Sequence, residues 1–274
     1  MRRNDWRDLP DEVRVAVRGH TGTVMDSKAA ESGAHSDITA ALWTETGPVF
    51  IKGVRIDSQS PDYWSLRREV RINPHVRHLA PRLLWHVEAG GWLVAGFEYV
   101  EGRHPDYSPD SPDLSCLARV VSSLLATPTP EGMSLRVESR WYGVDADLSP
   151  LGGDKLLHTD LNPGNLLIAD SRVYVIDWGH VTRGADWVEL GLLIPWLLQA
   201  GHTPAMADDW VSQFPVWYAA DDSAVDLFSD VNARKWAAFI MDTPWPWAVR
   251  MAHATQQWAD YWTARRSGAA GGMP

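Results

Sequence analysis

The sequence predicts an α+β fold in which a strand-rich first part precedes a mostly helical second part. Between residues 23 and 99, β-branched and apolar residues form five candidate strands, at 23–30, 37–45, 48–55, 82–88 and 92–99. Glycine turns at 46–47 and 90–91 favour hairpins between neighbouring strands. One helix is expected within this stretch, at 61–72. Helices are then expected at 113–126 and throughout 184–266.

Proline and capping residues indicate where the helices begin and end. A short helix at 10–19 begins with Pro10 and two acidic residues, which suit a helix N-terminus. Ser60 suits the N-cap of the 61–72 helix, and Pro74 disfavours its continuation. The segment 127–154 is expected to be irregular and the tail 267–274 disordered. The later helices should break at Gly201, Pro204, Pro215 and the 244–247 run.

Composition narrows the classes of function. The 274 residues suffice for one large domain or two tightly joined lobes. A net charge of −10 argues against a nucleic-acid partner and is compatible with a cationic substrate. The single cysteine, Cys116, can form no internal disulfide. The N-terminus lacks an apolar signal segment and the run 190–200 is too short to span a bilayer, so we expect a cytoplasmic protein without a membrane partner.

The most informative stretch runs from His158 to Asn165 and is followed twelve residues later by Asp177. The residues between Asn165 and Asp177 form two apolar runs around an Asp-Ser turn, which is typical of a β-hairpin. Folding the chain about residue 171 sets Asn165 opposite Asp177, so an amide oxygen and a carboxylate are expected side by side. Such hard oxygen ligands suit Mg²⁺ bridging ATP phosphates. The alternative is an Asn-Pro-Gly turn that caps an ordinary hairpin.

The pattern His158-x-Asp160, Asn165 and Asp177 resembles the catalytic loop and metal-binding aspartate of aminoglycoside phosphotransferases and related small-molecule kinases. The resemblance implies a protein-kinase-like bilobal α+β fold. Residues 1–101 would form the nucleotide-binding lobe, ending in a hinge at 98–102, and residues 102–274 a helical lobe with the catalytic loop and acceptor site. It also implies transfer of the γ-phosphoryl group of ATP, assisted by Mg²⁺, to a hydroxyl of a small molecule.

The resemblance assigns roles to these residues. Asp160 would be the catalytic base, and Asn165 and Asp177 the Mg²⁺ ligands. His158 would hold the loop internally, and Asp186 or Glu189 would anchor it through hydrogen bonds. Thr159 stands where many relatives carry glycine.

Lys52 and Glu69 are predicted to form an ion pair at the nucleotide site. Strand alternation places Lys52 on the apolar face with Phe50 and Val54, where a lysine needs an anionic partner. Lys52 thus resembles the lysine that holds the α- and β-phosphates. Glu69 is the natural partner, because Asp62, the other acid of its helix, lies at the positive N-terminus. The alternatives are a lysine that snorkels to the sheet edge and a solvated glutamate.

The remaining nucleotide contacts follow from the resemblance alone. Ser36, in the loop 31–37, would bind phosphate through its hydroxyl, although this loop lacks the G-x-G-x-x-G pattern. Adenine would lie against the hinge, at Phe97, Glu98 and Val100.

An aminoglycoside-like amino sugar is the acceptor that the resemblance favours, with antibiotic inactivation as the biological role. The alternatives are an amino alcohol such as choline or homoserine, and a catalytically silent nucleotide-binding pseudoenzyme. A protein kinase is disfavoured, because Trp178 follows Asp177 and residues 183–189 lead directly into a helix without an activation loop. Most of the ten tryptophans after residue 177 are expected in the core. We expect a monomer.

Overall fold

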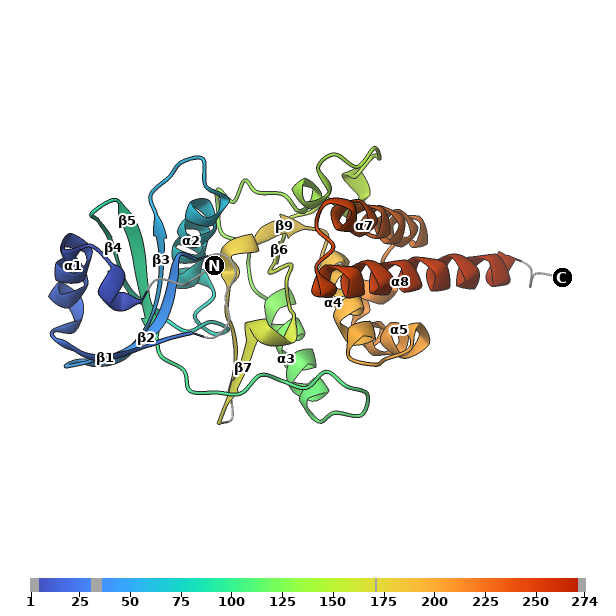
Figure 1. Cartoon of the computed structure of the whole chain (residues 1–274). Helices are drawn as coiled ribbons and strands as arrows, with labels where there is room; N and C mark the ends of the chain where they lie inside the picture. The colour runs from blue at the N-terminus through green and yellow to red at the C-terminus, as the bar shows by residue number, and fades with distance from the viewer. Residues whose placement is uncertain (1–4, 31–35, 171, 271–274) are drawn as a thin grey trace. The chain divides into compact units, whose positions relative to one another are not determined.

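The computed structural model describes residues 5–30, 36–170 and 172–270. The chain forms two compact units. The first comprises Met1–Arg103 together with Leu167–Val181, and the second comprises His104–Leu166 together with Thr182–Pro274. The first unit is built on an antiparallel sheet and the second is mostly helical, which confirms the α+β class (Figure 1). The boundary expected between residues 101 and 102 stays a prediction.

The first unit contains a five-stranded antiparallel sheet in the order β1-β2-β3-β5-β4. The predicted strands are all present, each within two residues of the expected ends. The glycine turns behave as expected, since Gly47, Gly90 and Gly91 all have positive φ. The strands are β1 (Val24–Ala29), β2 (Ile38–Thr44), β3 (Gly47–Arg55), β4 (Leu83–Ala89) and β5 (Trp92–Glu98).

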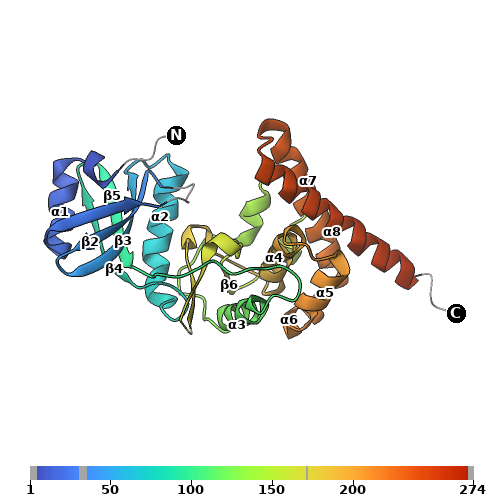
Figure 2. The same ribbon diagram turned by 60° about the horizontal axis from the view of Figure 1, so that its bottom comes forward.

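Both faces of this sheet are covered, each by one helix (Figure 2). Helix α1 (Asp11–Thr21) packs on the face that carries Val49 and Ile51. Helix α2 (Pro61–Ile72) packs on the opposite face, against Val54 and its strand neighbours. Because side chains alternate along a strand, Lys52 is placed on the α2 face, opposite Ala95 of β5.

Helix α2 has the bounds that its sequence predicts. Ser60 is the N-cap residue, although its side chain makes no capping hydrogen bond, and Pro61 fills the first turn. The buried face includes Tyr63, Leu66 and Glu69. A hairpin of β7 (Leu166–Ala169) and β8 (Arg172–Val175) forms as expected, with its turn residue Ser171 outside the described residues. The amide of Val175 donates to the carbonyl of Leu79 and so ties β8 to the first unit.

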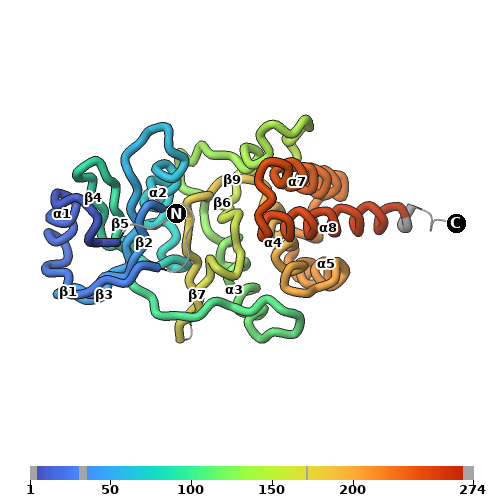
Figure 3. Tube along the Cα trace, viewed as in Figure 1, coloured from blue at the N-terminus to red at the C-terminus, as the bar shows by residue number. Residues whose placement is uncertain are grey.

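The second unit is assembled from helices and a two-stranded sheet. The long helices α7 (Asp222–Asp242) and α8 (Pro246–Ala270) run side by side (Figure 3). Trp187, Trp217 and Trp258 stack edge to face or tilted at the centre, which confirms that these tryptophans are core residues. The other elements are α3 (Asp113–Leu125), β6 (Lys155–Leu157), β9 (Thr182–Gly184), α4 (Trp187–Gln199), α5 (Pro204–Ser212) and α6 (Pro215–Tyr218).

Two segments were expected to lack regular structure, 127–154 and the tail from residue 267. The region 127–154 contains short 3-10 helices, η3 (Val137–Trp141) and η4 (Ser149–Leu151), and no longer helix among its described residues. The disorder expected from residue 267 is wrong at its start, because α8 continues to Ala270 and gains a backbone hydrogen bond with each added residue. Within the described ranges, none of the helices combines the length and apolar character that crossing a bilayer requires.

Candidate active site

Lys52 and Glu69 form a buried ion pair in the first unit, as the sequence predicts. The Nζ of Lys52 lies 3.0 Å and 2.9 Å from the two carboxylate oxygens of Glu69. The two side chains are only 12% and 8% exposed. Helix α2 brings Glu69 to β3 because Leu66 and Tyr63, one and two turns earlier, pack against the same sheet face. The alternatives of a snorkelling lysine and a solvated glutamate are therefore wrong.

Asp177 joins this pair. Its Oδ1 lies 3.3 Å from the Nζ of Lys52. Asp177 follows β8 and has a left-handed backbone, with φ of 63°, which an aspartate tolerates better than most residues. The next residue, Trp178, is buried and donates its indole N–H to the carbonyl of Val175. This contact closes the turn that points Asp177 at Lys52.

The turn after Asp177 is held against α2 at close range. A Cβ atom on Gly179 would lie 1.9 Å from the hydroxyl of Ser65, so a glycine is required here. The Nε of Arg68 donates to the carbonyl of Gly179 at 2.7 Å. One helix therefore positions both partners of Lys52: it carries Glu69 itself and contacts the turn that holds Asp177.

Two carboxylates stabilise the charge of Lys52. Burial favours a neutral Lys52, but the carboxylates of Glu69 and Asp177 outweigh it and raise the pKa of the lysine above its usual range. Both oxygens of Glu69 face the ammonium at hydrogen-bond distance, so we regard the pair as ionised. The result is a fixed cation beside a half-buried carboxylate, an arrangement that suits phosphate oxygens and a divalent cation.

The predicted catalytic loop lies in the second unit. His158 is fully buried, as a residue that holds the loop internally should be. Both carboxylate oxygens of Glu189, on α4, accept from the amide of Thr159 at 3.0 Å. Of the two acids expected to anchor the loop, Glu189 is therefore confirmed. Asp186 instead caps α4, by accepting from the amide of Trp187.

Thr159 has a strained backbone with φ of 70°, which a β-branched residue rarely adopts. A glycine would fit this conformation without strain. The threonine hydroxyl receives a hydrogen bond from the Nη1 of Arg140 at 2.8 Å. Arg140 belongs to η3, and the sequence provided no indication of its place here, because it lies nineteen positions earlier in a segment without periodic structure.

Asp160 and Asn165 are also brought together. The Nδ2 of Asn165 donates to the Oδ2 and to the backbone carbonyl of Asp160, both at 2.9 Å. These bonds fix the carboxylate and leave the amide oxygen of Asn165 directed away from Asp160. The bend is formed by η5 (Pro163–Asn165) immediately before β7.

The second unit also contains a buried acid with a perturbed pKa. Glu189 is 1% exposed, and burial raises its pKa to about 7. Hydrogen bonds from Thr159 and His158 and the charge of Arg140 oppose this shift, while the charge of Asp160 adds to it. The pKa of Glu189, which anchors the catalytic loop at Thr159, therefore lies near neutral pH.

The other predicted nucleotide residues lie in the first unit. Ser36 is half-buried just before β2, while the rest of its loop, residues 31–35, lies outside the described residues. Phe97 is buried against the α2 face. Glu98 ends β5 and accepts from the amide of Arg82, and Val100 is half-buried in the following loop. Their contacts with adenine or phosphate stay predictions.

The residues present fit a bound Mg²⁺ as far as each unit shows. Among the residues that the structure describes, no three His, Cys, Asp or Glu side chains gather to hold a metal ion. The predicted ligands are instead one amide and one carboxylate, completed by substrate phosphates, as Mg²⁺ commonly accepts. Asn165 directs its amide oxygen away from Asp160, and Asp177 is 29% exposed beside Lys52. Each side chain presents an oxygen suited to the ion.

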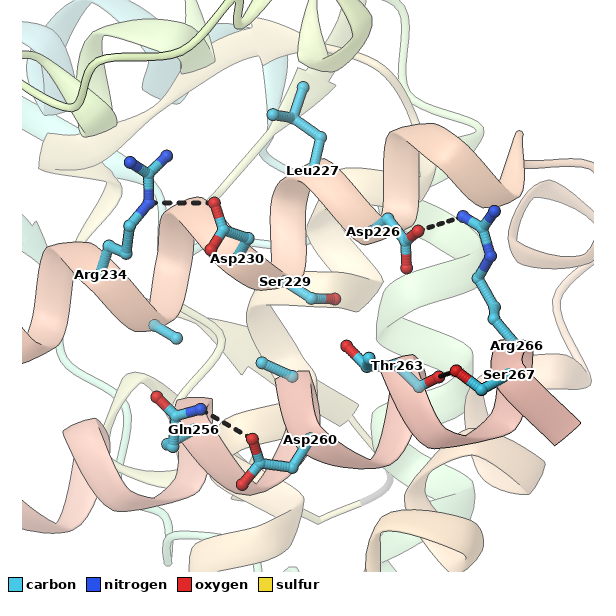
Figure 4. Close-up of a pocket in the computed structure, with 12 residues that line it drawn as sticks. Asp226, Leu227, Ser229, Asp230, Arg234, Gln256, Asp260, Thr263, Arg266 and Ser267 are labelled. Atoms are coloured by element: carbon cyan, nitrogen blue, oxygen red, sulfur yellow. Dashed lines mark hydrogen bonds and ion pairs between the residues drawn. The ribbon is translucent and has the colours of Figure 1, made fainter.

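A cavity of about 700 Å³ lies within the second unit, between α7 and α8, and its lining includes none of the predicted site residues (Figure 4). Its walls carry ion pairs between Asp226 and Arg266 and between Asp230 and Arg234. Gln256 donates to Asp260 across one turn of α8. Since the charged arginine and aspartate groups that line the cavity satisfy one another, we do not assign it to the chemistry of the catalytic loop.

One stretch of the chain matches the model of a known protein family. Residues 125–222, which include Asp160, Asn165 and Asp177, match the model of the phosphotransferase enzyme family (APH). A search of curated proteins finds no match.

Several solved structures share the fold. Choline kinase LicA from Streptococcus pneumoniae aligns with a TM-score of 0.62 and 14% identity over 91% of this chain and 98% of its own. Its complex with AMP aligns with a TM-score of 0.59 and 15% identity over 91% and 98%. A thermostable mutant of aminoglycoside phosphotransferase APH(4)-Ia aligns with a TM-score of 0.58 and 16% identity over 92% of this chain and 98% of its own. A putative fructosamine-3-kinase from Haemophilus somnus 129PT aligns with a TM-score of 0.60 and 11% identity over 92% of this chain and 97% of its own.

These comparisons confirm the resemblance that the motif indicates. The neighbours include kinases of aminoglycosides, choline and fructosamine, so their fold is common to several acceptors. The chain therefore has the protein-kinase-like fold of small-molecule kinases, and its residues 125–222 carry the sequence pattern of the phosphotransferase enzyme family.

Proposed function

We propose that this protein transfers the γ-phosphoryl group of ATP to a hydroxyl group of a small molecule. The observation that carries the proposal is the contact of Lys52 with both Glu69 and Asp177. A buried lysine held by two carboxylates is not explained by stability alone, because apolar residues would fill the same space at lower desolvation cost. It is explained by a need for a fixed cation at a phosphate site. The match of residues 125–222 to a phosphotransferase family supports the same conclusion.

Each predicted site residue has a role in this proposal. Lys52 binds the α- and β-phosphates, and Glu69 holds its ammonium in place. Asn165 and Asp177 hold Mg²⁺, which neutralises charge on the phosphates when it is bound. Ser36 contacts phosphate, and Phe97, Glu98 and Val100 border the adenine. A nucleotide site of this kind is supported by the complex of a structural neighbour with AMP.

Asp160 acts on the acceptor. Its carboxylate accepts the proton of the acceptor hydroxyl as the hydroxyl oxygen forms a bond to the γ-phosphorus. The bond between that phosphorus and the bridging oxygen breaks, and ADP leaves with the electron pair. The hydrogen bond from Asn165 fixes one oxygen of Asp160, so the other is available for the hydroxyl.

The acceptor has one leading candidate, and two alternatives stay open. An aminoglycoside-like amino sugar is the first candidate by resemblance, with antibiotic inactivation as its consequence. An amino alcohol such as choline or homoserine is the alternative, and a nucleotide-binding pseudoenzyme is the alternative of another class. We also expect a cytoplasmic monomer without nucleic-acid or membrane partners, in keeping with the net charge of −10.

The test is ADP release from Mg·ATP in the presence of a panel of aminoglycosides, amino alcohols and hydroxy acids, with phosphorus NMR of the products. We expect one acceptor class to stimulate ADP release and to yield a phosphate monoester. Tight binding of Mg·ATP with no phosphorylated product from any class would favour the pseudoenzyme. Failure to bind Mg·ATP at all would refute the proposal.

A further inference from the structure

Lys235 is a basic residue of the second unit that packs between two tryptophan rings. It lies on α7 and is half-buried. Its Nζ lies 5.8 Å from the ring centre of Trp141 and 5.7 Å from that of Trp236. Its neighbour Arg234, by contrast, pairs with Asp230 on another face of the helix. Within the described part of the chain, no salt bridge is formed by Lys235.

The surroundings of Lys235 disfavour its charge. Burial and, second, the nearby charge of Arg140 lower the pKa of Lys235 to about 7. Contacts with aromatic faces compensate only part of the cost of burying an ammonium group. Arg140 adds a second unsatisfied group, since its Nε–H is buried and donates to no acceptor among the described residues. An anion bound between these side chains would balance the charge of Lys235 and accept a hydrogen bond from the Nε of Arg140.

Arg140 connects this cluster to the catalytic loop. Its Nη1 donates to the hydroxyl of Thr159, the residue that precedes Asp160. The carboxylates that face Arg140, those of Asp160 and Glu189, already accept hydrogen bonds from Asn165 and from the amide of Thr159. A molecule held at Lys235 would therefore lie on the side of the loop where Arg140 approaches the proposed base.

An aromatic surface continues outward from Lys235. Trp236 contacts Phe239 and Trp247, with ring centres 5.4 Å and 5.8 Å apart, and Trp247 contacts Trp245. Phe239, Trp247 and Trp245 are 38%, 41% and 58% exposed. Exposed rings in one cluster indicate a binding surface for an apolar or planar group.

Such rings also recognise quaternary ammonium groups in other proteins. Here the ammonium of Lys235 already faces two of the rings, those of Trp141 and Trp236, and would repel a second cation. The charge of this surface therefore disfavours a cationic acceptor.

We propose that Lys235 binds an anionic group, a carboxylate or phosphate, of the acceptor, whose apolar or planar body lies on the surface formed by Trp236, Phe239, Trp245 and Trp247. This inference rests on the proposed phosphotransfer and narrows its acceptor to hydroxy compounds that carry a negative charge. It departs from the polycationic amino sugar that the resemblance favours.

A binding experiment tests the inference without any turnover. Phenyl phosphate is titrated into the protein with Mg·ADP at saturation, and the affinity is measured by calorimetry. We expect binding to wild type and a loss of at least ~10-fold in Lys235→Gln, the order of a charge-assisted hydrogen bond. Lys235→Arg should restore binding, and Arg234→Gln is the matched control that should not change it. Absence of binding to wild type, or equal binding to Lys235→Gln, overturns the inference.

A second titration addresses the cationic rival. Benzyltrimethylammonium presents the same ring with the opposite charge. Tighter binding of this compound than of phenyl phosphate to wild type would mean that the aromatic surface recognises a cation, and would also overturn the inference. Melting temperatures and circular dichroism of each variant identify any loss of binding that results from unfolding.

A kinetic experiment separates this inference from the proposed function. The acceptors are 4-(hydroxymethyl)benzoate and 4-(hydroxymethyl)benzylamine, two alcohols of similar shape and opposite charge. We expect turnover of the benzoate, with a KM that rises at least ~10-fold in Lys235→Gln at similar kcat. Preferred turnover of the amine or of an aminoglycoside overturns the inference and leaves the phosphotransfer intact. Lys235-dependent phenyl phosphate binding without turnover of any alcohol supports the anion site and counts against the proposed function.

Discussion

Both carboxylate oxygens of Glu189 lie 3.0 Å from the backbone nitrogen of Thr159, directly before the proposed catalytic base Asp160. Thr159 is held in a left-handed conformation that a threonine rarely adopts. The anchor on α4 thus compensates local strain in the loop, and strain of this kind persists only where the surrounding contacts enforce it. The position of Asp160 consequently depends on an acid that lies thirty residues after Thr159.

Glu189→Gln should change how stability depends on pH. Burial raises the folded-state pKa of Glu189 to about 7, above the unfolded value, so the native state binds more protons between these two values. The contribution of Glu189 to stability is then present at low pH and is lost as the pH rises toward 7. We expect the stability of wild type relative to Glu189→Gln to fall by on the order of 2 kcal/mol between pH 4.5 and 7.5. Urea unfolding at both pH values measures this, and parallel profiles would contradict it.

Lys52→Met should impair nucleotide binding. Removing the ammonium leaves Glu69 and Asp177 without their cation and removes the contact with phosphate that we propose for Lys52. We expect the Kd for Mg·ATP, measured by calorimetry with a non-hydrolysable analogue, to rise at least ~10-fold. The exposed Lys28, on β1 of the same unit, provides the control Lys28→Met. An unchanged Kd in Lys52→Met would remove this residue from the nucleotide site.

Asp160→Asn should separate chemistry from binding. The variant keeps the size of the side chain but cannot accept the proton of the acceptor hydroxyl. We expect turnover to fall at least ~100-fold while Mg·ATP affinity stays largely intact. Asp170→Asn is the control, because Asp170 is exposed in the hairpin turn and its positive φ tolerates asparagine. Near-normal kcat in Asp160→Asn would exclude Asp160 as the base.

Asp177→Asn should reduce the affinity for Mg²⁺. Asparagine also tolerates the left-handed backbone at this position, so the turn is preserved while the charge of one proposed Mg²⁺ ligand is lost. We expect the Mg²⁺ concentration for half-maximal ADP binding to rise at least ~10-fold, and a smaller rise in Asn165→Ala, which removes a neutral ligand. If Mg²⁺ dependence is identical in wild type and both variants, these residues do not hold the ion.

An NMR titration of the lysine side chains should show a lowered pKa for Lys235. The chain has four lysines, Lys28, Lys52, Lys155 and Lys235, so carbon NMR of methylated lysines gives few signals. The signal that is lost in Lys235→Gln should titrate with a midpoint near the pKa of about 7. Since this folded-state pKa lies below the unfolded value of ~10.4, the unfolded chain binds more protons between them and stability rises with pH over that window. A midpoint above pH 9 would contradict the environment described for Lys235.

Local patterns in the sequence were sufficient for most elements of the fold. Hydrophobic alternation and the glycine turns located the five strands, and Pro61 and Pro74 located the ends of α2. Alternation also placed Lys52 on an apolar face, and the scarcity of acids on α2 left Glu69 as its partner, which the ion pair confirms. These inferences succeed because they depend on residues that are close in sequence or share one periodic element.

Contacts across long sequence separations were not predictable from the chain alone. Arg140 contacts Thr159 from an irregular 3-10 segment, and Lys235 lies near Arg140 on a helix that begins more than fifty residues after the catalytic loop. No local period encodes which face of η3 meets α7; the packing of Trp141 against Phe228 and its hydrogen bond to Asn232 establish it. The spacing of the motif residues from His158 to Asp177 was sufficient to predict phosphotransfer. The charge around the proposed acceptor site arises only when distant side chains are packed together, because burial and neighbouring charges, rather than residue type, decide what a cation can bind.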